Sequence, residues 1–295
     1  MTSLPHRPPI VPADLVEASE PAPESLRPWL TELGRIPTVL DLSEPFTHIP
    51  QTSTTIVLRE EQRGPRAALV VGPRTKAIYS RASRPAGCVR LRLAPGAVGP
   101  LLGVSAALLT DRVVRLQDLP GPAADLATVL VALAPDEVLP YLESELPRRI
   151  TDDAAQRTQR RLLGSAVAAI AADPPRPVPD LAARLSVSER QLRNLFTTGI
   201  GVSPKHFARI DRVRRVLSHA GDTSTADIAG TAGYYGRQTV KIPQISLAQL
   251  ATDNGYYDQS HLSADFRTLM GVPPSRFFRG QLPTPTPCWP LDPGF

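Results

Sequence analysis

A short polar segment near residue 190 carries side chains of the types that recognise DNA bases. Arginine can bond guanine through two hydrogen bonds, and asparagine or glutamine can bond adenine in the same way. The segment offers four such groups: Arg190, Gln191, Arg193 and Asn194. The apolar residues among them recur at the spacing of one side of a helix: Leu192, Leu195 and Phe196. This pattern predicts a helix that packs through one side and presents base-reading side chains on the other.

The residues before this segment predict the helix that must support it. Residues 178–185 carry Leu181, Ala182 and Leu185 at helical spacing, and a short turn at 186–188 follows. Ser188 is suited to cap the next helix, because its hydroxyl can accept a hydrogen bond from a free backbone N–H of the first turn. Residues 178–198 therefore predict a helix-turn-helix.

A second copy of the pattern lies seventy residues further along. Six positions of the first unit recur at this one offset, namely Leu192, Phe196, Gly201, Val202, Pro204 and Phe207 as Leu262, Phe266, Gly271, Val272, Pro274 and Phe277. Asp258 is placed to cap a recognition helix over 259–270, after a first helix over 247–252. We therefore expect a second helix-turn-helix over 246–270.

The charge of the chain is concentrated in this region. Residues 1–150 carry 16 basic and 16 acidic residues, whereas 151–295 carry 17 and 12, which accounts for the formal charge of +5. Between Arg176 and Arg215 there are nine basic residues and three acidic ones. A long helix over 204–219 carries four of these arginines and would join the two units. Such an excess suits phosphate contact and predicts salt-sensitive DNA binding.

The elements before residue 150 predict a different architecture. The chain has 295 residues, enough for two domains. Proline and glycine divide residues 20–98 into short apolar segments, at 54–59, 67–71, 77–80 and 88–94, which favour antiparallel strands in a sandwich or partial barrel. Apolar runs at 101–109 and 123–134, with 137–146, predict helices beside this sheet, and a polar break follows at 147–155. The expected fold class is α+β, with a β-rich domain at 20–150, an all-α domain at 155–280 and a proline-rich tail at 281–295.

Other function classes have less support in the sequence. Cys88 and Cys288 are the two cysteines, and the five histidines show no metal-ligand spacing, so we expect no metal and no cofactor. No phosphate-binding loop or nucleophile elbow is present, so we expect no catalysis. The longest apolar runs are far shorter than the roughly 18 residues of a membrane span. A cytoplasmic location is the natural expectation.

In its C-terminal half the sequence resembles the AraC/XylS family of bacterial transcription regulators. The resemblance covers about residues 155–280 and is carried by 181–182, 188–196 and 201–204 in the first unit, and by 255–262, Phe266 and 271–274 in the second. The N-terminal half resembles, more loosely, a sensor-type domain of such regulators, for which we expect a cupin-like β fold. The marks of that likeness are 69–73, 89–96 and 108–116.

The resemblance implies roles for particular residues. It places base contacts on Arg190, Arg193, Asn194, Gln259 and Ser260. Backbone contact or positioning falls on Ser188, Gln191, Lys205, Arg209, Arg212, Arg215, Tyr257, His261 and Arg267. The implied partners are double-stranded operator DNA, a small-molecule effector at the N-terminal domain, RNA polymerase if the protein activates transcription, and a second copy of the chain if it forms a homodimer.

Two departures from the family pattern leave alternatives open. Ala264 and Asp265 stand where basic or polar residues are common, and a carboxylate near phosphates would be repelled. Residues 226–235 also resemble 248–257 at an offset of 22, which indicates a duplicated insert over 221–243. The insert would preserve, relax or abolish use of the second unit. A disabled second unit would leave an interaction protein that does not bind DNA, and a catalytic N-terminal domain fused to a DNA-binding module is a further alternative.

Overall fold

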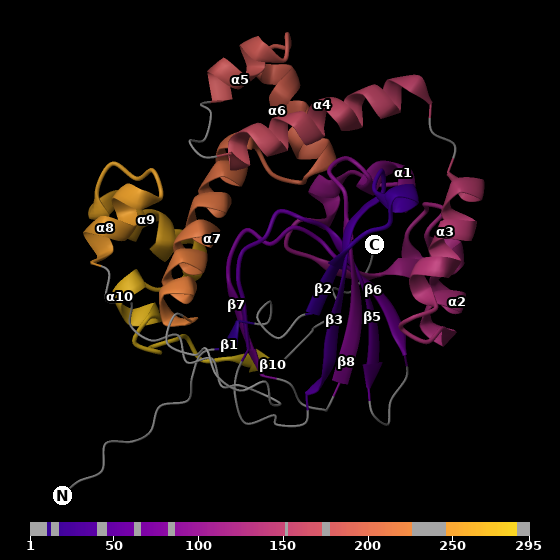
Figure 1. Cartoon of the computed structure of the whole chain (residues 1–295), viewed down its shortest axis with the longest axis horizontal. Coiled ribbons are helices and arrows are strands. Elements are labelled where there is room, and N and C mark those ends of the chain that lie inside the picture. Colours follow the sequence, from indigo (N-terminus) through magenta and orange to yellow (C-terminus); the bar gives the residue numbers. More distant parts are fainter. Residues whose placement is uncertain are drawn as a thin grey trace, which may run out of the picture.

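The computed structural model describes residues 11–12, 18–39, 46–61, 66–81, 86–150, 153–172, 178–225 and 246–287. A strand-rich N-terminal region is followed by a helical C-terminal region (Figure 1). Helices α2 and α3 lie on one side of the strands, and α7 descends along the other side (Figure 1). The predicted α+β class is confirmed by this arrangement.

The larger sheet has six antiparallel strands, in the order β2-β3-β8-β5-β6-β9. Their bounds are β2 (Ala18–Pro21), β3 (Leu30–Val39), β8 (Ala86–Leu93), β5 (Thr55–Glu61), β6 (Ala67–Val71) and β9 (Val113–Arg115). The alternation of apolar and charged residues in β8 places Val89, Leu91 and Leu93 in the main core. The strands predicted at 54–59, 67–71 and 88–94 are confirmed. Strand β6 has the predicted bounds, and the ends of β5 and β8 differ from the predicted ends by one or two residues.

A second sheet joins the two ends of the chain. It has the order β1-β4-β7-β10, with β1 (Val11–Pro12), β4 (Phe46–His48), β7 (Ile78–Arg81) and β10 (Thr286–Pro287). Strand β10 belongs to the predicted proline-rich tail and pairs in parallel with β7. This part of the tail is therefore a strand of the second sheet. Residues 288–295 lie outside the described residues.

The single helix expected at 101–109 is wrong, whereas the helix expected at 123–134 is confirmed in part, as a 3₁₀ turn that leads directly into a short α-helix over 124–132. Over 98–132 the structure has α1 (Val98–Leu102), the 3₁₀ turns η3 (Ala106–Leu109), η4 (Leu116–Asp118) and η5 (Ala124–Leu126), and then α2 (Ala127–Ala132). Another 3₁₀ turn, η2 (Glu24–Leu26), lies before β3. Helix α1 ends because Gly103 adopts φ 72°, a left-handed conformation that glycine takes without strain. Gly121 packs directly against the end of α1, where a Cβ would lie 2.2 Å from the carbonyl carbon of Leu102.

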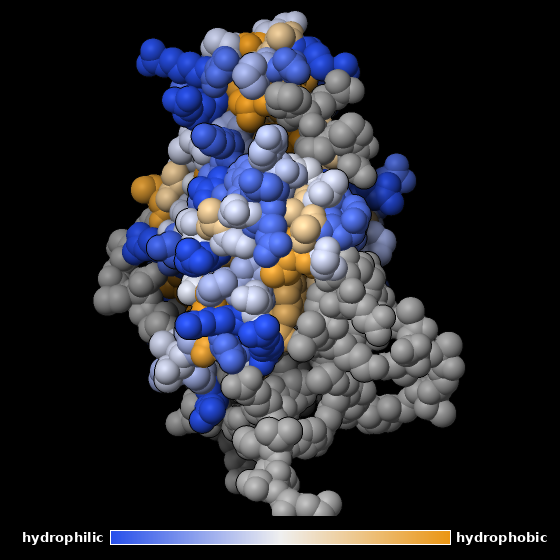
Figure 2. Space-filling view, turned by 90° about the vertical axis from the view of Figure 1, so that its left-hand side faces the viewer, coloured by the Kyte–Doolittle hydropathy of each residue, from blue (hydrophilic) through white to orange (hydrophobic). Residues whose placement is uncertain are grey.

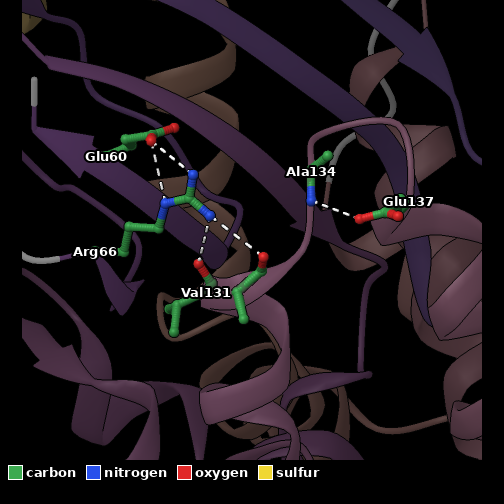
Figure 3. A network of polar contacts seen from close by, with 6 residues as sticks. Glu60, Arg66, Val131, Ala134 and Glu137 are labelled. Atoms are coloured by element: carbon green, nitrogen blue, oxygen red, sulfur yellow. Dashed lines mark hydrogen bonds and ion pairs between the residues drawn. The ribbon is translucent and has the colours of Figure 1, made fainter.

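Helix α2 is attached to the sheet by an arginine. Arg66, just before β6, donates from Nε and Nη2 to Glu60 Oε1 at 3.1 and 2.7 Å. Its Nη1 donates to the carbonyls of Val131 and Ala132, at 3.2 and 3.3 Å (Figure 3). These carbonyls belong to the last turn of α2, which lacks donors of its own, so the guanidinium satisfies the end of the helix.

The break between the two regions is shorter than predicted. Helix α3 (Val138–Arg149) continues through Pro147 and the next helix begins at Ala154, so the break expected at 147–155 is confined to 150–153. The helices that follow are α4 (Ala154–Ala171), α5 (Val178–Arg184), α6 (Glu189–Gly199), α7 (Pro204–Thr225), α8 (Leu247–Asp253), α9 (Gln259–Met270) and α10 (Pro274–Phe277). Helix α7 is longer than the expected 204–219 and includes the first five residues of the expected insert. Residues 226–243 of that insert lie outside the described residues.

The close contact at Gly121 generates a stability prediction. We expect Gly121→Ala to lower the free energy of unfolding by about 3 kcal/mol, because the new methyl group has no space beside α1. Gly164→Ala, in α4, is the matched control. No described atom lies within 4 Å of its added Cβ, so alanine should stabilise the helix by about 1 kcal/mol. Urea unfolding of both variants measures the difference, and equal effects would contradict this packing.

Candidate nucleic-acid interface

The first helix-turn-helix has a fully formed cap at its recognition helix. Ser188 Oγ accepts from the backbone N–H of Gln191 at 3.1 Å, and Gln191 Oε1 accepts from the N–H of Ser188 at 2.8 Å. Together they form a capping box. Ser188 and Gln191 were both predicted to contact or position the DNA backbone, and the structure shows that their side chains fix the start of α6.

Helix α6 separates its buried and exposed residues as the spacing predicts. Leu192 and Phe196 are fully buried, and the Phe196 ring meets the Phe207 ring of α7 edge to face, with centroids 5.6 Å apart. The three predicted base-reading residues are exposed: Arg190, Arg193 and Asn194. The structure therefore brings these three side chains to one solvent-facing side of a firmly packed helix.

The second helix-turn-helix reproduces these features. Asp258 Oδ1 accepts from the backbone N–H of His261 at 2.7 Å, which is the bond that Ser188 accepts in the first unit, seventy residues earlier. Gln259, Ser260, His261 and Arg267 are all exposed on α9. The side of the molecule that carries α8 to α10 shows mainly hydrophilic side chains, with smaller apolar patches (Figure 2).

The turn of the second unit has one residue more than the first. The N–H of Val187 bonds the carbonyl of Ala182, and the N–H of Tyr256 bonds that of Ala251, an offset of 69 rather than 70. The additional residue is Tyr257, whose side chain is 93% exposed. Tyr256 is buried instead, with the Arg212 guanidinium 4.9 Å from its ring centroid. One tyrosine is therefore packed in the core and the other is available to solvent.

Asp265 corrects an expectation from the sequence. Its side chain is only 8% exposed and points to the linker helix, where Arg209 Nε donates to Oδ1 at 2.9 Å and Arg212 Nη2 lies 3.5 Å from Oδ2. The carboxylate therefore does not face the exposed side of α9 and cannot repel phosphates there. It neutralises two arginines and attaches α9 to α7.

The other predicted phosphate contacts of the linker helix are similarly engaged. Arg215 Nε pairs with Asp211 Oδ2 at 3.2 Å on the same helix. Burial raises the pKa of the Asp211 carboxyl, an effect that Arg215 and the neighbouring arginines partly offset. Arg214 donates to the carbonyl of Pro50 in the strand-rich region at 3.1 Å. Lys205 at the start of α7 is exposed.

His206 lies near the same charge cluster and is half-buried. Burial lowers the pKa of its imidazole, and the charge of Arg209 adds to this effect. His206 therefore favours the neutral form, and the cationic surface of the linker helix is left to its arginines and to Lys205.

A structural residue of the second unit was missed by the pattern analysis. Asn254 is 1% exposed, and its Nδ2 donates to the carbonyl of Leu250 at 2.9 Å, which holds the turn after α8. The Asn-Gly pair at 254–255 signals a turn in sequence, but burial of the asparagine side chain has no sequence signature.

A cavity of about 330 Å³ lies between the strand-rich region and the first unit. It is lined from one side by α1 and the loop after it, and from the other by α4 and the end of α6. Polar groups of its wall include Gln156, Gln159 and Arg160. The Arg160 guanidinium lies over the Trp29 ring, 4.3 Å from its centroid.

Among the described residues, no three His, Cys, Asp or Glu side chains come together as a metal site would require. None of the described helices combines the length and apolar character needed to cross a membrane.

The pairing of Asp265 predicts the effect of removing it. We expect Asp265→Ala to lower the free energy of unfolding by about 3 kcal/mol, because Arg209 and Arg212 would keep their positive charges in partly buried positions without a counter-charge. Arg267→Ala on the exposed side of the same helix should change it by less than about 0.5 kcal/mol. Thermal and urea unfolding compare the two; a loss at Arg267 as large as that at Asp265 would refute the assignment.

No protein-family model matches the chain, and no curated protein matches it. Among solved structures, it is similar to several of ToxT from Vibrio cholerae. An apo variant of ToxT from strain SCE256 is 12% identical, with a TM-score of 0.40 over 88% of this chain and 99% of that one. ToxT from strain O395 bound to (E)-4-(8-methylnaphthalen-1-yl)but-3-enoic acid is 10% identical, with a TM-score of 0.39 over 84% and 97%.

A third match is ToxT from strain SCE256 bound to an unsaturated fatty acid, at 12% identity and a TM-score of 0.34 over 83% of this chain and 90% of that one. ToxT is an AraC-family regulator with a strand-rich N-terminal and a helical C-terminal arrangement.

Proposed function

We propose that this protein is a sequence-specific DNA-binding transcription regulator of the AraC/XylS type. The observation that carries the proposal is the pair of equivalent recognition helices, α6 and α9. Each begins at a side-chain cap, buries an apolar side and exposes polar side chains near its N-terminal end. The N-terminal residues of a recognition helix are the ones that meet base edges in the major groove.

The exposed residues suggest a division of roles. Arg190, Arg193 and Asn194 of α6, with Gln259 and Ser260 of α9, would read bases. Lys205, Tyr257, His261 and Arg267 would contact the phosphate backbone. Arg209, Arg212 and Arg215 would position the linker helix, since each is paired with a carboxylate of the protein.

The alternative of a disabled second unit loses one of its three grounds. It was motivated by Ala264, by Asp265 and by the duplicated insert over 221–243, and the Asp265 carboxylate faces α7 rather than the exposed side of α9. The cap and the exposed side of α9 match those of α6. We therefore favour two working recognition helices over a protein that interacts without DNA.

The finer parts of the proposal have support of different kinds. The cavity of about 330 Å³ between the strand-rich region and the first unit supports a small-molecule effector, because cavities of this size accommodate small ligands. The division into domains at 20–150 and 155–280, RNA polymerase as a partner of an activator, a homodimer and a cytoplasmic location stay predictions from the sequence.

The division of roles predicts two different losses of DNA binding. Arg193→Ala should lower the preference for the selected site over a site with one changed base by about 1–3 kcal/mol. Lys205→Ala should weaken binding to all sequences alike and reduce the slope of log affinity against log salt by about 1. Sites selected from random DNA and titrated at several salt concentrations measure both effects. Uniform, equal losses in the two variants would contradict the assignment.

The effector proposal is tested by narrowing the mouth of the cavity. Gly99 is an exposed residue of its lining, and no described atom lies within 4 Å of an added Cβ, so Gly99→Leu adds a bulky side chain there without a clash. A panel of small carboxylates, chosen because Arg160 is in the wall, is screened for a rise in Tm. Compounds that bind there should stabilise the wild type and Gly164→Leu but not Gly99→Leu. Equal shifts in all three proteins would place the ligand elsewhere.

A further inference from the structure

The strand-rich region donates a backbone hydrogen bond to each recognition helix, and in both helices the accepting carbonyl is at the equivalent position near the C-terminal end. The backbone N–H of Gly96 donates to the carbonyl of Gly199 at 3.3 Å, and the N–H of Ala77 donates to that of Leu269 at 2.7 Å. Gly199 and Leu269 are seventy residues apart, the offset that relates the two units throughout. Two different segments of the N-terminal region thus make one bond to equivalent points.

Each bond belongs to a larger contact. In the first docking contact, formed by Gly96, Ser105 and Thr110 with the end of α6, Thr110 Oγ1 also donates to the carbonyl of Gly201 at 2.9 Å. In the second, formed by Ala77 and Tyr79 with the end of α9, the Tyr79 hydroxyl donates to the carbonyl of Met270 at 2.6 Å. Tyr79 is 7% exposed and is part of the core of the second unit.

The chemistry of helix ends explains why the contacts form there. The last four carbonyls of a helix have no intrahelical donor, so they accept bonds from another element. Docking at the C-terminal end also leaves the N-terminal end of each recognition helix, with its exposed polar side chains, directed to solvent. Both helices can therefore be held and still be presented to DNA.

The C-terminal segment strengthens the second contact. Strand β10 pairs in parallel with β7, where Thr286 lies opposite Ser80, and Thr286 Oγ1 donates to the carbonyl of Tyr79 at 3.3 Å. The strand that bonds the end of α9 is therefore also covered by the chain that leaves the second unit. Two sequence-distant connections hold this unit on the strand-rich region.

We propose that residues 77–81 and 86–110 act as a template that fixes the separation of the two recognition helices, so that the protein selects DNA by the spacing of two half-sites. The inference rests on the proposed DNA binding. Helices that enter successive major grooves on one side of DNA must lie about 34 Å apart. Two rigid contacts on one region satisfy such a requirement better than a linker alone.

Two equivalent glycines provide a matched test. Gly201 has φ 96°, and an added Cβ would lie 2.6 Å from Thr110 Oγ1 and 2.8 Å from the carbonyl oxygen of Ala106. Gly271, its equivalent in the second unit, has φ 72° with no described atom within 4 Å. Alanine introduces backbone strain at both positions, but only Gly201→Ala pushes a recognition helix off the template. Gly271→Ala is therefore the control.

The first measurement needs no DNA. Spin labels are attached to Ala183→Cys and Ala248→Cys, at exposed positions outside the recognition helices, in the full chain with Cys88 and Cys288 changed to serine. Pulsed electron resonance should give one narrow distance distribution for the parent and for Gly271→Ala. Gly201→Ala should give a broad one, and so should Tyr79→Phe, which removes the hydroxyl donor of the second contact and keeps the ring. Distributions as narrow as the parent's in both variants would overturn the proposal.

The second measurement uses DNA with two half-sites at varied separation. The parent and Gly271→Ala should prefer one spacing by about 100-fold, because bivalent binding is lost when the geometry forbids it. Gly201→Ala should bind all spacings within about twofold of one another, near the affinity of a single half-site. An unchanged preference in Gly201→Ala would refute the template. If the parent binds no DNA, the proposed function fails, and the distance measurement still decides whether the template exists.

Discussion

The carbonyl groups at the ends of the recognition helices are the constraint on which this structure depends. A helix leaves its last carbonyls without donors, and the polar side chains at the other end of α6 and α9 are exposed, so the contacts that hold these helices fall at their carbonyl ends. The strand-rich region supplies the donors from Gly96 and Ala77. Gly199 allows the first of these contacts because it has no side chain. A Cβ added there would lie 2.4 Å from Leu163 Cδ2 and 3.3 Å from the Cα of Gly96. The architecture of the N-terminal region is thus coupled to the presentation of both recognition helices.

A second constraint is the use of charge within the helical region. The sequence between Arg176 and Arg215 has six more basic than acidic residues, which by itself suggests one continuous phosphate-binding surface. In the structure, Arg209 and Arg212 of the linker helix form ion pairs with Asp265, and Arg215 forms one with Asp211. Breaking a partly buried ion pair leaves an uncompensated charge, so these arginines stabilise the arrangement of helices. Between residues 178 and 215, the cations with exposed side chains are Arg184 of α5, Arg190 and Arg193 of α6, and Lys205 at the start of α7.

Periodic signals made the helices and strands predictable, whereas contacts between distant segments were not. The seventy-residue repeat and the caps at Ser188 and Asp258 located both units, and the short apolar segments between prolines and glycines located β5, β6 and β8. The helix expected at 101–109 failed because Gly103 and Gly121 come together in space, and composition alone does not reveal that approach. The partner of Asp265 lies 56 residues earlier, at Arg209. Local patterning carries no information about such a pairing, so the carboxylate was assigned to the wrong side of its helix.

The connection between α7 and the second unit has less influence on geometry than its length suggests. An insert between two recognition helices relaxes their separation only if the chain connection is what sets it. Here α9 is attached to α7 through Asp265 and a shared core with Ile210 and Val213, and to the strand-rich region through Leu269 and Met270. Closing a longer loop costs only a little more free energy, because this cost rises with the logarithm of loop length. The position of the second recognition helix is therefore set by packing and hydrogen bonds, and a duplicated segment between Thr225 and Ser246 is compatible with a fixed separation.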